Sequence, residues 1–335
     1  MNKFTFVECT TISDTLDQMG GSAVVKAGGI DLLDLMKDGI VSPPTLINIR
    51  QVKELRGITV SDQGLTLGPL TTLSELAAHP VIREKYTALS DAAGHAATPQ
   101  VRNMATVGGN IMQRQRCWYF RSAEFPCLRK GGEECFAQKG ENQYHAIMDN
   151  SVCAMVHPSS TAVPLTAFDA QVELTSKKGK RTVKLSEFYV KPEQSLTEEN
   201  VVKPGELITS IFIPVTASGT KSAYQKYGEK ESFDWPLVDA GVVLVMDGST
   251  CRNASIVLGV AAPTPIHATA AEAALKGKTI DEAVARAAGK AAMADASPLA
   301  KNGYKVQLFQ TIIYRTILLA AGQLTRDPSA VGGMA

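Results

Sequence analysis

The sequence predicts an α+β protein that contains more than one domain. Its 335 residues exceed what a single small core needs and suit two or three domains. Hydrophobic residues make up 44% of the chain and charged residues 20%, values close to those of globular proteins, so a packed core is expected. Strand and helix patterns alternate near the start of the chain, whereas strands come before helices near its end. This change of order predicts two architectures in succession.

The first part of the chain predicts a small unit in which strands and helices alternate. A strand–helix–strand order at this spacing is typical of parallel pairing. Glycine follows the last periodic residue of the second helix, where it can end a helix. The expected strands are FTFVEC (4–9), AVVKAGG (23–29) and TLINIR (45–50), and the expected helices are TISDTLDQM (11–19) and DLLDLMKDG (31–39).

The remaining pattern predicts a second unit and then a C-terminal domain. The second unit is expected to contain a hairpin around Lys178-Gly179 and a strand in ELITSIFIPV (206–215). Ser, Gly and Thr in PVTASGTKSAY then interrupt two periodic segments, which favours a domain boundary there. We therefore expect a first domain over 1–215, divided at about 1–55 and 56–215, and a second domain over 216–335, where strands precede alanine-rich helices.

Charge and hydropathy narrow the classes of partner. The net charge of +1 is far from the strong positive charge typical of nucleic-acid binders, so no nucleic-acid partner is expected. No apolar run reaches the roughly 18 residues of a membrane span. The start MNKFTFVECTT lacks the basic and apolar regions of a secretory signal, which favours the cytoplasm. Export to the periplasm together with a partner that carries a signal is the alternative.

Two glycine pairs follow or precede apolar segments in a way that suits phosphate binding. In VVKAGGIDLLDLMK, the pair Gly28-Gly29 ends a strand just before a helix, whose N-terminal N–H groups can bind an anion. In TVGGNI, a second pair precedes Asn110. Taken singly, an ordinary strand–helix joint and a β-turn stabilised by Asn explain the two pairs better. Two such loops in one chain favour one large phosphate-bearing ligand.

Four cysteines are concentrated in the middle of the chain. Cys117, Cys127, Cys135 and Cys153 are separated by 9, 7 and 17 residues. Structural zinc sites usually contain a pair of cysteines two to four residues apart, and no such pair is present. Wider spacing suits an iron–sulfur cluster, although zinc and unlinked core cysteines remain possible on spacing alone. Cys9 and Cys251 lie in apolar strand-like segments and are expected in the core.

Two histidines and a run of basic residues near these cysteines are not expected to bind metal or nucleic acid. His145 and His157 flank the fourth cysteine and are expected to donate or accept hydrogen bonds, since four thiolates complete a metal site. A basic run is interleaved with aromatic residues, a pattern that can bind nucleic acid. Nearby glutamates dilute its charge, so a solvated rim or a face that docks another subunit is preferred. The run comprises Arg114, Arg116, Arg121, Arg129 and Lys130.

These motifs together resemble the FAD-binding medium subunit of the xanthine dehydrogenase and carbon monoxide dehydrogenase family of molybdenum hydroxylases. KAGGIDLLDLMK is similar to the first flavin loop of that family and TVGGNI to the second, in the same order. HPSSTAVP and SAYQKYGEKESFDWPLVDAGVVL are also similar to family segments. RCWYF after the GGN loop and a cysteine before HPS resemble the branch that holds a [4Fe–4S] cluster, as in aldehyde oxidoreductase flavin subunits.

The resemblance implies a set of FAD-binding residues and no catalytic residue in this chain. Ile30 stands where the family usually has Thr, and Ser160 stands where it usually has Asp. Ile208 is expected near the isoalloxazine and Lys226 near the ring. The pyrophosphate is expected to contact Lys26, Ala27, Gly28, Gly29, Ile30, Asp31, Leu32 and Leu33, and the ribityl and phosphate portions Thr106, Gly108, Gly109, Asn110 and Gln113. The implied cluster ligands are Cys117, Cys127, Cys135 and Cys153, within an insertion at about 113–155.

The resemblance also implies fold, partners and function. It predicts a two-subdomain FAD-binding domain (PCMH-type) and a smaller C-terminal α/β domain with an antiparallel sheet and helices. A large molybdenum-cofactor subunit oxidises the substrate, a small [2Fe–2S] subunit passes electrons on, and this chain delivers them from FAD to an external acceptor. Two rival hypotheses remain: a zinc-stabilised binding module without flavin, and a stand-alone flavin oxidoreductase that needs no partner subunits.

Overall fold

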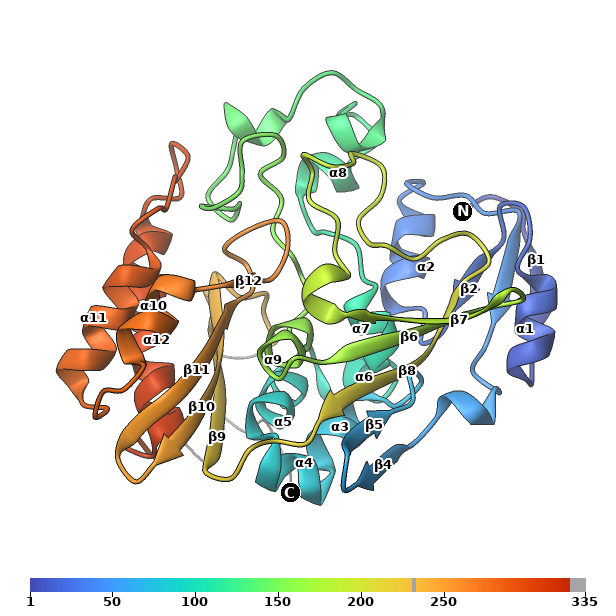
Figure 1. Ribbon diagram of the computed structural model, residues 1–335. Helices are drawn as coiled ribbons and strands as arrows, with labels where there is room; N and C mark the ends of the chain where they lie inside the picture. Colours follow the sequence, from blue (N-terminus) through green and yellow to red (C-terminus); the bar gives the residue numbers. More distant parts are fainter. Residues whose placement is uncertain (231–232, 326–335) are drawn as a thin grey trace.

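The computed structural model describes residues 1–230 and 233–325, and within them the chain forms three β-sheets. The N-terminal sheet lies at one side of the molecule, a five-stranded sheet lies in the middle, and the C-terminal sheet lies at the other side (Figure 1). The first sheet is parallel and the other two are antiparallel. Helices accompany all three sheets, so the predicted α+β class is confirmed.

The parallel N-terminal sheet has the strand–helix–strand order that the sequence predicts. β1 (Thr5–Glu8) and β2 (Val24–Lys26) both pair with the central β3 (Thr45–Asn48). Helix α1 (Ile12–Gln18) connects β1 to β2, and α2 (Ile30–Lys37) connects β2 to β3. Parallel neighbours require such crossover connections. As a result, the carboxyl end of β2 leads directly into the N-terminus of α2.

The central sheet has the strand order β4-β5-β8-β6-β7, and short helices pack against it. Its strands are β4 (Ile58–Ser61), β5 (Gly64–Leu67), β6 (Gln171–Ser176), β7 (Gly179–Lys184) and β8 (Leu207–Pro214). The antiparallel pairing of β6 with β7 confirms the predicted hairpin. The helices are α3 (Leu73–Ala78), α4 (Pro80–Lys85), α5 (Thr87–Gly94), α6 (Pro99–Arg102), α7 (Val107–Ile111) and α9 (Ala162–Ala167), with 3₁₀ turns at Lys53–Leu55 and Leu185–Glu187.

The C-terminal part is a four-stranded antiparallel sheet covered by helices, as expected from the order of its patterns. Its strands are β9 (Thr220–Tyr227), β10 (Val238–Asp247), β11 (Thr250–Leu258) and β12 (Ile266–His267). Its helices are α10 (Thr269–Leu275), α11 (Glu282–Ala292) and α12 (Tyr304–Ala321). Cys251 is buried in its core and Cys9 in the N-terminal core, as predicted. The division of the chain at residues 215 and 216 stays a prediction.

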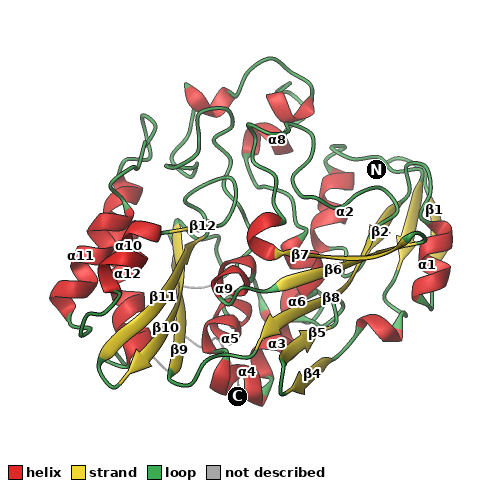
Figure 2. Ribbon diagram, in the orientation of Figure 1, coloured by secondary structure: helices red, strands yellow, loops and turns green. Residues whose placement is uncertain are grey.

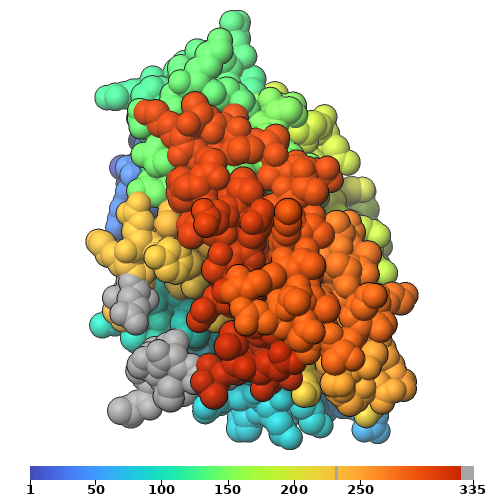
Figure 3. All heavy atoms as spheres, turned by 90° about the vertical axis from the view of Figure 1, so that its left-hand side faces the viewer, coloured from blue at the N-terminus to red at the C-terminus, as the bar shows by residue number. Residues whose placement is uncertain are grey.

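The cysteine segment, residues 113–155, follows α7 and has little regular structure. It contains α8 (Trp118–Arg121) and 3₁₀ turns at Leu128–Lys130 and Phe136–Gln138, joined by long loops (Figure 2). In the space-filling view this green segment lies above the orange and red C-terminal helices (Figure 3). Asn302 Nδ2 donates to the His145 carbonyl at 3.1 Å, and Ile147 N–H donates to the Ala261 carbonyl at 2.9 Å. Hydrogen bonds therefore connect this segment to the C-terminal part of the molecule.

Crossing a bilayer requires a helix that is both long and strongly apolar. None of the helices among residues 1–230 and 233–325 meets both conditions.

Candidate cofactor site

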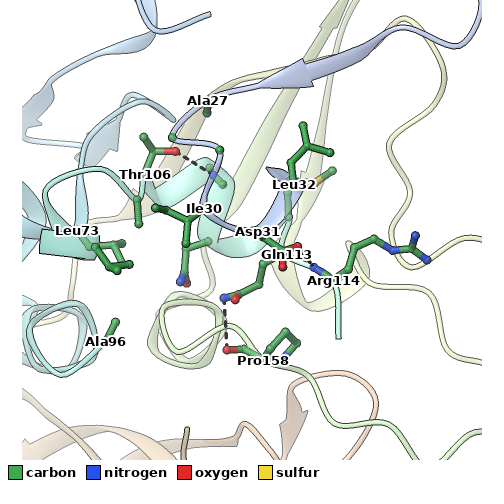
Figure 4. Close-up of a pocket in the computed structure, with 18 of the residues that line it drawn as sticks. Ala27, Ile30, Asp31, Leu32, Leu73, Ala96, Thr106, Gln113, Arg114 and Pro158 are labelled. Carbon is green, nitrogen blue, oxygen red and sulfur yellow. Dashed lines mark hydrogen bonds between the residues drawn. The ribbon is translucent and has the colours of Figure 1, made fainter. Parts of the chain in front are cut away.

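A large pocket opens between the N-terminal sheet, the central helices and the loop after β9. Its volume is about 480 Å³, within the range typical of cofactor sites. Both glycine pairs contribute to its wall, as do Gln113, Ile208 and Lys226. Figure 4 shows Ile30 and Asp31 from α2 near Thr106, which caps α7, and Gln113, which follows α7. Segments about eighty residues apart in the sequence thus form one cavity.

The first glycine pair is required by its backbone surroundings. Gly28 lies against Met104 and Ala105, and a Cβ on Gly28 would overlap the Met104 carbonyl oxygen. Gly29 precedes α2 with a φ of 81°, in the left-handed region that favours glycine. Gly29 offers no side chain to cap α2, so the N–H groups of the first helical turn remain available to an anionic ligand.

The second glycine pair lies in a short helix, so the expected loop or β-turn is wrong. Val107–Ile111 forms α7, and the Thr106 Oγ1 atom caps this helix by accepting from Gly109 N–H at 3.1 Å. Gly108 N–H donates to the Pro69 carbonyl at 2.9 Å, and a Cβ on Gly108 would lie only 2.7 Å from the Pro69 Cβ atom. Glycine here permits the close approach of α7 to the turn before α3.

Hydrogen bonds fix the polar side chains around the pocket. The Asn110 Oδ1 atom accepts from Ser159 Oγ at 2.7 Å, and Gln113 Nε2 donates to the Pro158 carbonyl at 3.3 Å (Figure 4). Lys226 Nζ donates to the Asp234 carbonyl at 2.9 Å, and burial lowers the pKa of this lysine. Because these partners belong to the protein, the side chains are held in place before any ligand binds.

The structure brings together all the residues expected at the cofactor except Leu33. Leu33 is not on the pocket wall, and its side chain lies close to Gly29. The residues that line the pocket as expected are Lys26, Ala27, Gly28, Gly29, Ile30, Asp31, Leu32, Thr106, Gly108, Gly109, Asn110, Gln113, Ser160, Ile208 and Lys226.

Sequence reasoning missed two aromatic residues at the pocket. Phe233 and Trp235 line it, although their side chains are 54% and 49% exposed. The Arg116 guanidinium lies 4.7 Å from the centre of the Trp235 ring, which is a cation–π distance. The signal was present as the aromatic pair in FDWP between two strands, where loop aromatics often contact ligands.

The four cysteines of the cysteine segment line one small cavity. Cys117, Cys127, Cys135 and Cys153 share this cavity with Tyr119, Phe120 and Phe136, among others. The cavity volume is about 20 Å³, and all four thiols are free. Within the described part of the chain, however, no three His, Cys, Asp or Glu side chains are arranged to hold a metal ion. The cysteines therefore converge, but the expected metal site is not confirmed.

Backbone donors surround these sulfur atoms. Cys117 receives hydrogen bonds from the backbone of Tyr119 and Phe120, although burial raises the pKa of its thiol to about 12. The hydrogen bond between Cys135 and Cys153 lowers the pKa of Cys135 and raises that of Cys153, and backbone donors from Ala137, Gln138 and Ala154 lower the pKa of Cys135 further. Donors of this kind favour the thiolate form, which is the form that binds metals. The donor set thus fits a group bound through thiolates.

The two histidines near Cys153 make the contacts expected of hydrogen-bonding side chains. The His145 Nε2 atom lies 3.2 Å from Cys117 Sγ, and the ring packs edge-on against Trp118. Burial lowers the pKa of His145 to about 4 and that of His157 to about 3. His157 Nδ1 accepts from Ser159 N–H at 3.4 Å. Both rings are consequently neutral at pH 7.

The arginines of the basic run form ion pairs within the chain, so the interpretation as a solvated rim is wrong for them, whereas a face that docks another subunit stays a prediction. Arg114 pairs with Glu199 at 2.8 Å, and Arg121 pairs with Asp31 at 2.7 Å. The Arg129 side chain is only 1% exposed and donates to the Leu196 carbonyl at 3.2 Å. These arginines form intramolecular contacts, which connect the cysteine segment to α2 and to the loop after β7.

Comparisons with known proteins agree with this architecture. Residues 2–216 match the FAD binding domain in molybdopterin dehydrogenase, and residues 222–320 match the CO dehydrogenase flavoprotein C-terminal domain. The chain is 34% identical over 330 residues to the aldehyde oxidoreductase FAD-binding subunit PaoB of Escherichia coli (strain K12), covering 96% of this chain and 100% of that protein. It is 29% identical over 284 residues to the carbon monoxide dehydrogenase medium chain of Hydrogenophaga pseudoflava, covering 84% of this chain and 82% of the relative.

A solved structure shares the fold over nearly the whole chain. The match is to carbon monoxide dehydrogenase from Hydrogenophaga pseudoflava, in a form that lacks the Mo-pyranopterin moiety of its cofactor. It has a TM-score of 0.75 and 27% identity, and it covers 97% of this chain and 99% of the other. The glycine-lined pocket, the matched domains and this shared fold lead to one assignment. The chain belongs to the FAD-binding medium subunits of the xanthine dehydrogenase and carbon monoxide dehydrogenase family of molybdenum hydroxylases.

Proposed function

We infer that this chain binds FAD in the large pocket and a [4Fe–4S] cluster among the four cysteines, and transfers electrons within a molybdenum hydroxylase. The observation that carries this proposal is the adjacency of the two sites. The second glycine segment lines the pocket and continues directly into the cysteine segment, with Gln113 and Arg116 on the pocket wall and Cys117 in the cysteine cavity. A redox cofactor and a cluster bound there would lie close together.

FAD suits the pocket because the pocket has a charged end and an apolar end. The free N–H groups at the start of α2 suit the pyrophosphate, since they carry the positive end of the helix dipole. Ile208, Phe233 and Trp235 supply apolar surface that suits a planar ring. Lys226 is on the same wall, where its charge favours a reduced, anionic flavin. We assign the lining residues, and not Leu33, to FAD contact.

A four-iron cluster suits the cysteine cavity for chemical reasons. Four thiols converge there, and backbone N–H groups donate to the sulfur atoms of Cys117 and Cys135. The thiolates of a cluster are spread over several ångströms, wider than the ligands of one ion, which suits the wide spacing of these cysteines. When bound, the cluster would supply one-electron chemistry. The protein would orient it through Cys117, Cys127, Cys135 and Cys153, with His145 against Cys117.

The remaining parts of the proposal concern partners. A large molybdenum-cofactor subunit would oxidise the substrate, and a small [2Fe–2S] subunit would pass the electrons to this chain. FAD would then reduce an external acceptor. The aldehyde oxidoreductase and carbon monoxide dehydrogenase names of the relatives support such an assembly. A cytoplasmic location, with co-export as its alternative, stays a prediction.

The proposal is tested by following flavin reduction in the assembled complex and in the isolated chain. The complex is co-purified under anaerobic conditions and supplied with a panel of aldehydes and purines. Flavin absorbance should bleach when a substrate is added to the complex, whereas the isolated chain should show no bleaching with the same panel. Bleaching of the isolated chain would instead support the stand-alone flavin oxidoreductase.

Replacement of one cysteine tests the cluster separately. Cys127→Ser should remove most of the iron, because a cluster with three thiolates is held less firmly, and FAD should stay bound at saturating concentration. Cys251→Ser is the matched control, since Cys251 is buried in the C-terminal core away from the cavity. Full iron occupancy in Cys127→Ser would show that Cys127 is not a ligand. Zinc in place of iron, with no flavin, would favour the binding-module alternative.

A further inference from the structure

We propose that Asp31 is a positioning residue that couples occupancy of the FAD pocket to the order of the cysteine segment. The inference rests on the proposed function, because it takes FAD as the ligand of the pocket. Asp31 lies in the first turn of α2, two residues after Gly29, and lines the pocket. Its side chain is 15% exposed and turns toward the cysteine segment, not toward the solvent.

One carboxylate binds three successive parts of the cysteine segment. The Asp31 Oδ2 atom accepts from the backbone N–H of Arg114 at 2.8 Å (Figure 4). Its Oδ1 atom accepts from Arg121 Nη2 at 2.7 Å and lies 3.1 Å from Arg116 Nη2. Charge-assisted hydrogen bonds of this length are among the stronger polar contacts in proteins. The backbone of Arg114 and the side chains of Arg116 and Arg121, which lie on either side of Cys117, are therefore bound to the first turn of α2.

Arg121 connects Asp31 to the backbone before Cys117 through further hydrogen bonds. Its Nε atom donates to the Gln115 carbonyl at 3.0 Å, and its Nη2 atom donates to the Arg114 carbonyl at 3.0 Å. Gln115 in turn accepts from Cys117 N–H at 3.1 Å through Oε1. The Arg121 side chain is 11% exposed, so solvent screens these contacts only weakly. A displacement of Asp31 would reach Cys117 through three hydrogen bonds, by way of Arg121 and Gln115.

Apolar packing provides a second, independent connection between the same elements. Leu35, one turn further along α2, is buried in a cluster with Phe120 and Cys127. Ile40 and Val41, which follow the helix, pack against the same cluster. Leu35 of α2 thus packs with Phe120 and Cys127, which line the cysteine cavity, while the N-terminus of α2 lines the FAD pocket. A ligand that orders the first turn of α2 would stabilise both connections.

Linkage makes this coupling reciprocal. If FAD favours the ordered cysteine segment, then ordering of that segment favours FAD by the same factor. Residues 117–135 are not on the wall of the pocket as described, so FAD cannot protect them by direct contact. Any effect of FAD on these residues has to pass through α2 or the chain before Cys117. This separation makes the coupling measurable.

The test measures backbone hydrogen exchange of residues 117–135 in the full chain, with and without saturating FAD. The apoprotein is prepared by removing flavin without removing iron. FAD should slow exchange of these residues about fivefold or more, the lower end of typical coupling between sites. In Asp31→Asn, which loses the ion pairs to Arg116 and Arg121, the slowing measured at an FAD concentration that saturates the variant should fall to less than half that in the wild type, whatever the affinity of the variant for FAD.

Asp34→Asn is the matched control. Asp34 lies one turn later in α2 and pairs with the same arginines, but its side chain is 51% exposed and it holds no backbone group of the segment. In this variant, FAD should still slow hydrogen exchange of residues 117–135 nearly as much as in the wild type. If Asp31→Asn does not fold, Arg121→Lys replaces it, because lysine keeps the charge but loses the forked donation to residues 114 and 115.

The outcomes separate the two proposals. If FAD binds the wild type but leaves exchange of residues 117–135 unchanged, the coupling is wrong and FAD binding stands. An equal FAD effect in Asp31→Asn and in the wild type would show that Asp31 does not carry the coupling. A wild-type chain that binds no flavin would instead overturn the proposed function. A role of Asp31 in general stability would raise exchange equally with and without FAD.

Discussion

The FAD pocket and the cysteine segment are neighbours, but their shapes depend on different parts of the chain. The pocket is formed by backbone at the ends of regular elements, where Gly28, Gly29 and Gly108 allow close approaches. The cysteine segment has few regular elements, and side chains from α2 and α12 hold it. Local sequence can encode the first kind of site, whereas the second requires contacts between distant segments. The variants below should damage one region and spare the other.

Gly28→Ala should have the largest effect on the pocket. The added Cβ would overlap the Met104 carbonyl, so the two glycine segments could no longer pack together. We expect FAD affinity to fall by more than about tenfold, the equivalent of about 1.4 kcal/mol, with iron retained in part. Gly20→Ala is the matched control because a Cβ there meets no neighbour. Equal FAD binding by the two variants, measured by fluorescence titration, would contradict the assigned pocket.

Gly132→Ala should damage the cysteine segment and spare the FAD pocket. A Cβ on Gly132 would overlap the Pro126 carbonyl, so the loop between Cys127 and Cys135 could not close. Iron content, measured by mass spectrometry of metals, should fall below about half of the wild-type value because two of the four thiols are displaced. Gly131→Ala is the neighbouring control, with open space but a φ of 84°, and should cost only about 1 kcal/mol. Similar iron losses in both variants would argue against the steric explanation.

Lys305 tests how the cysteine segment depends on the C-terminal domain. Its Nζ atom donates to the carbonyls of His145 at 3.0 Å and Val260 at 2.8 Å. Burial lowers the pKa of Lys305 to about 7, against about 10.4 in the unfolded chain. Between these values the unfolded state binds the extra proton, so stability rises with pH, by at most about 1.4 kcal/mol per unit.

Lys305→Met should remove this rise. Denaturant unfolding between pH 7 and 9 should give the wild type a steeper increase of stability with pH than the variant, whatever the offset between them. Lys301→Met is the control, since the Lys301 side chain is 48% exposed and pairs with Glu141 at the surface. Parallel pH profiles for the wild type and Lys305→Met would contradict a lowered pKa for Lys305.

Thr106→Val should have the smallest effect on FAD binding. It tests whether the cap of α7 contributes to FAD affinity as well as to stability. The change removes the cap that accepts from Gly109 N–H and should cost about 1 kcal/mol of stability. Thr11→Val removes the cap of α1, where Thr11 accepts from Asp14 N–H, and should cost a similar amount. Only Thr106→Val should also weaken FAD binding, because α7 lines the pocket. Equal FAD affinity in both variants would restrict Thr106 to a structural role.

The sequence allowed correct prediction of features that depend on local pattern. The parallel first sheet followed from its strand–helix–strand spacing, and the residues around Gly28 converge with those around Gly109 as expected. The short helix α7 was missed because two glycines and an asparagine disfavour a helix, and here Thr106 and the contact with Pro69 outweigh that tendency.

Features that depend on contacts between distant segments were not predictable. Arg121 and Asp31 are 90 positions apart, and Arg114 and Glu199 are 85 apart. A run of arginines in the sequence looks the same whether it faces solvent or internal carboxylates. The convergence of the cysteines was expected from family resemblance, since spacing alone left zinc and separate core thiols open. The position of the Leu33 side chain near Gly29, away from the pocket wall, likewise depends on the exact turn of α2.

The central claim is that this chain carries two redox groups side by side, and one measurement tests it most directly. Flavin and metals are quantified in the same sample of wild-type protein purified without oxygen. We expect about one FAD and about four iron atoms per chain, without stoichiometric zinc. Stoichiometric zinc without iron would contradict the cluster, and the absence of flavin would contradict the assignment of the pocket.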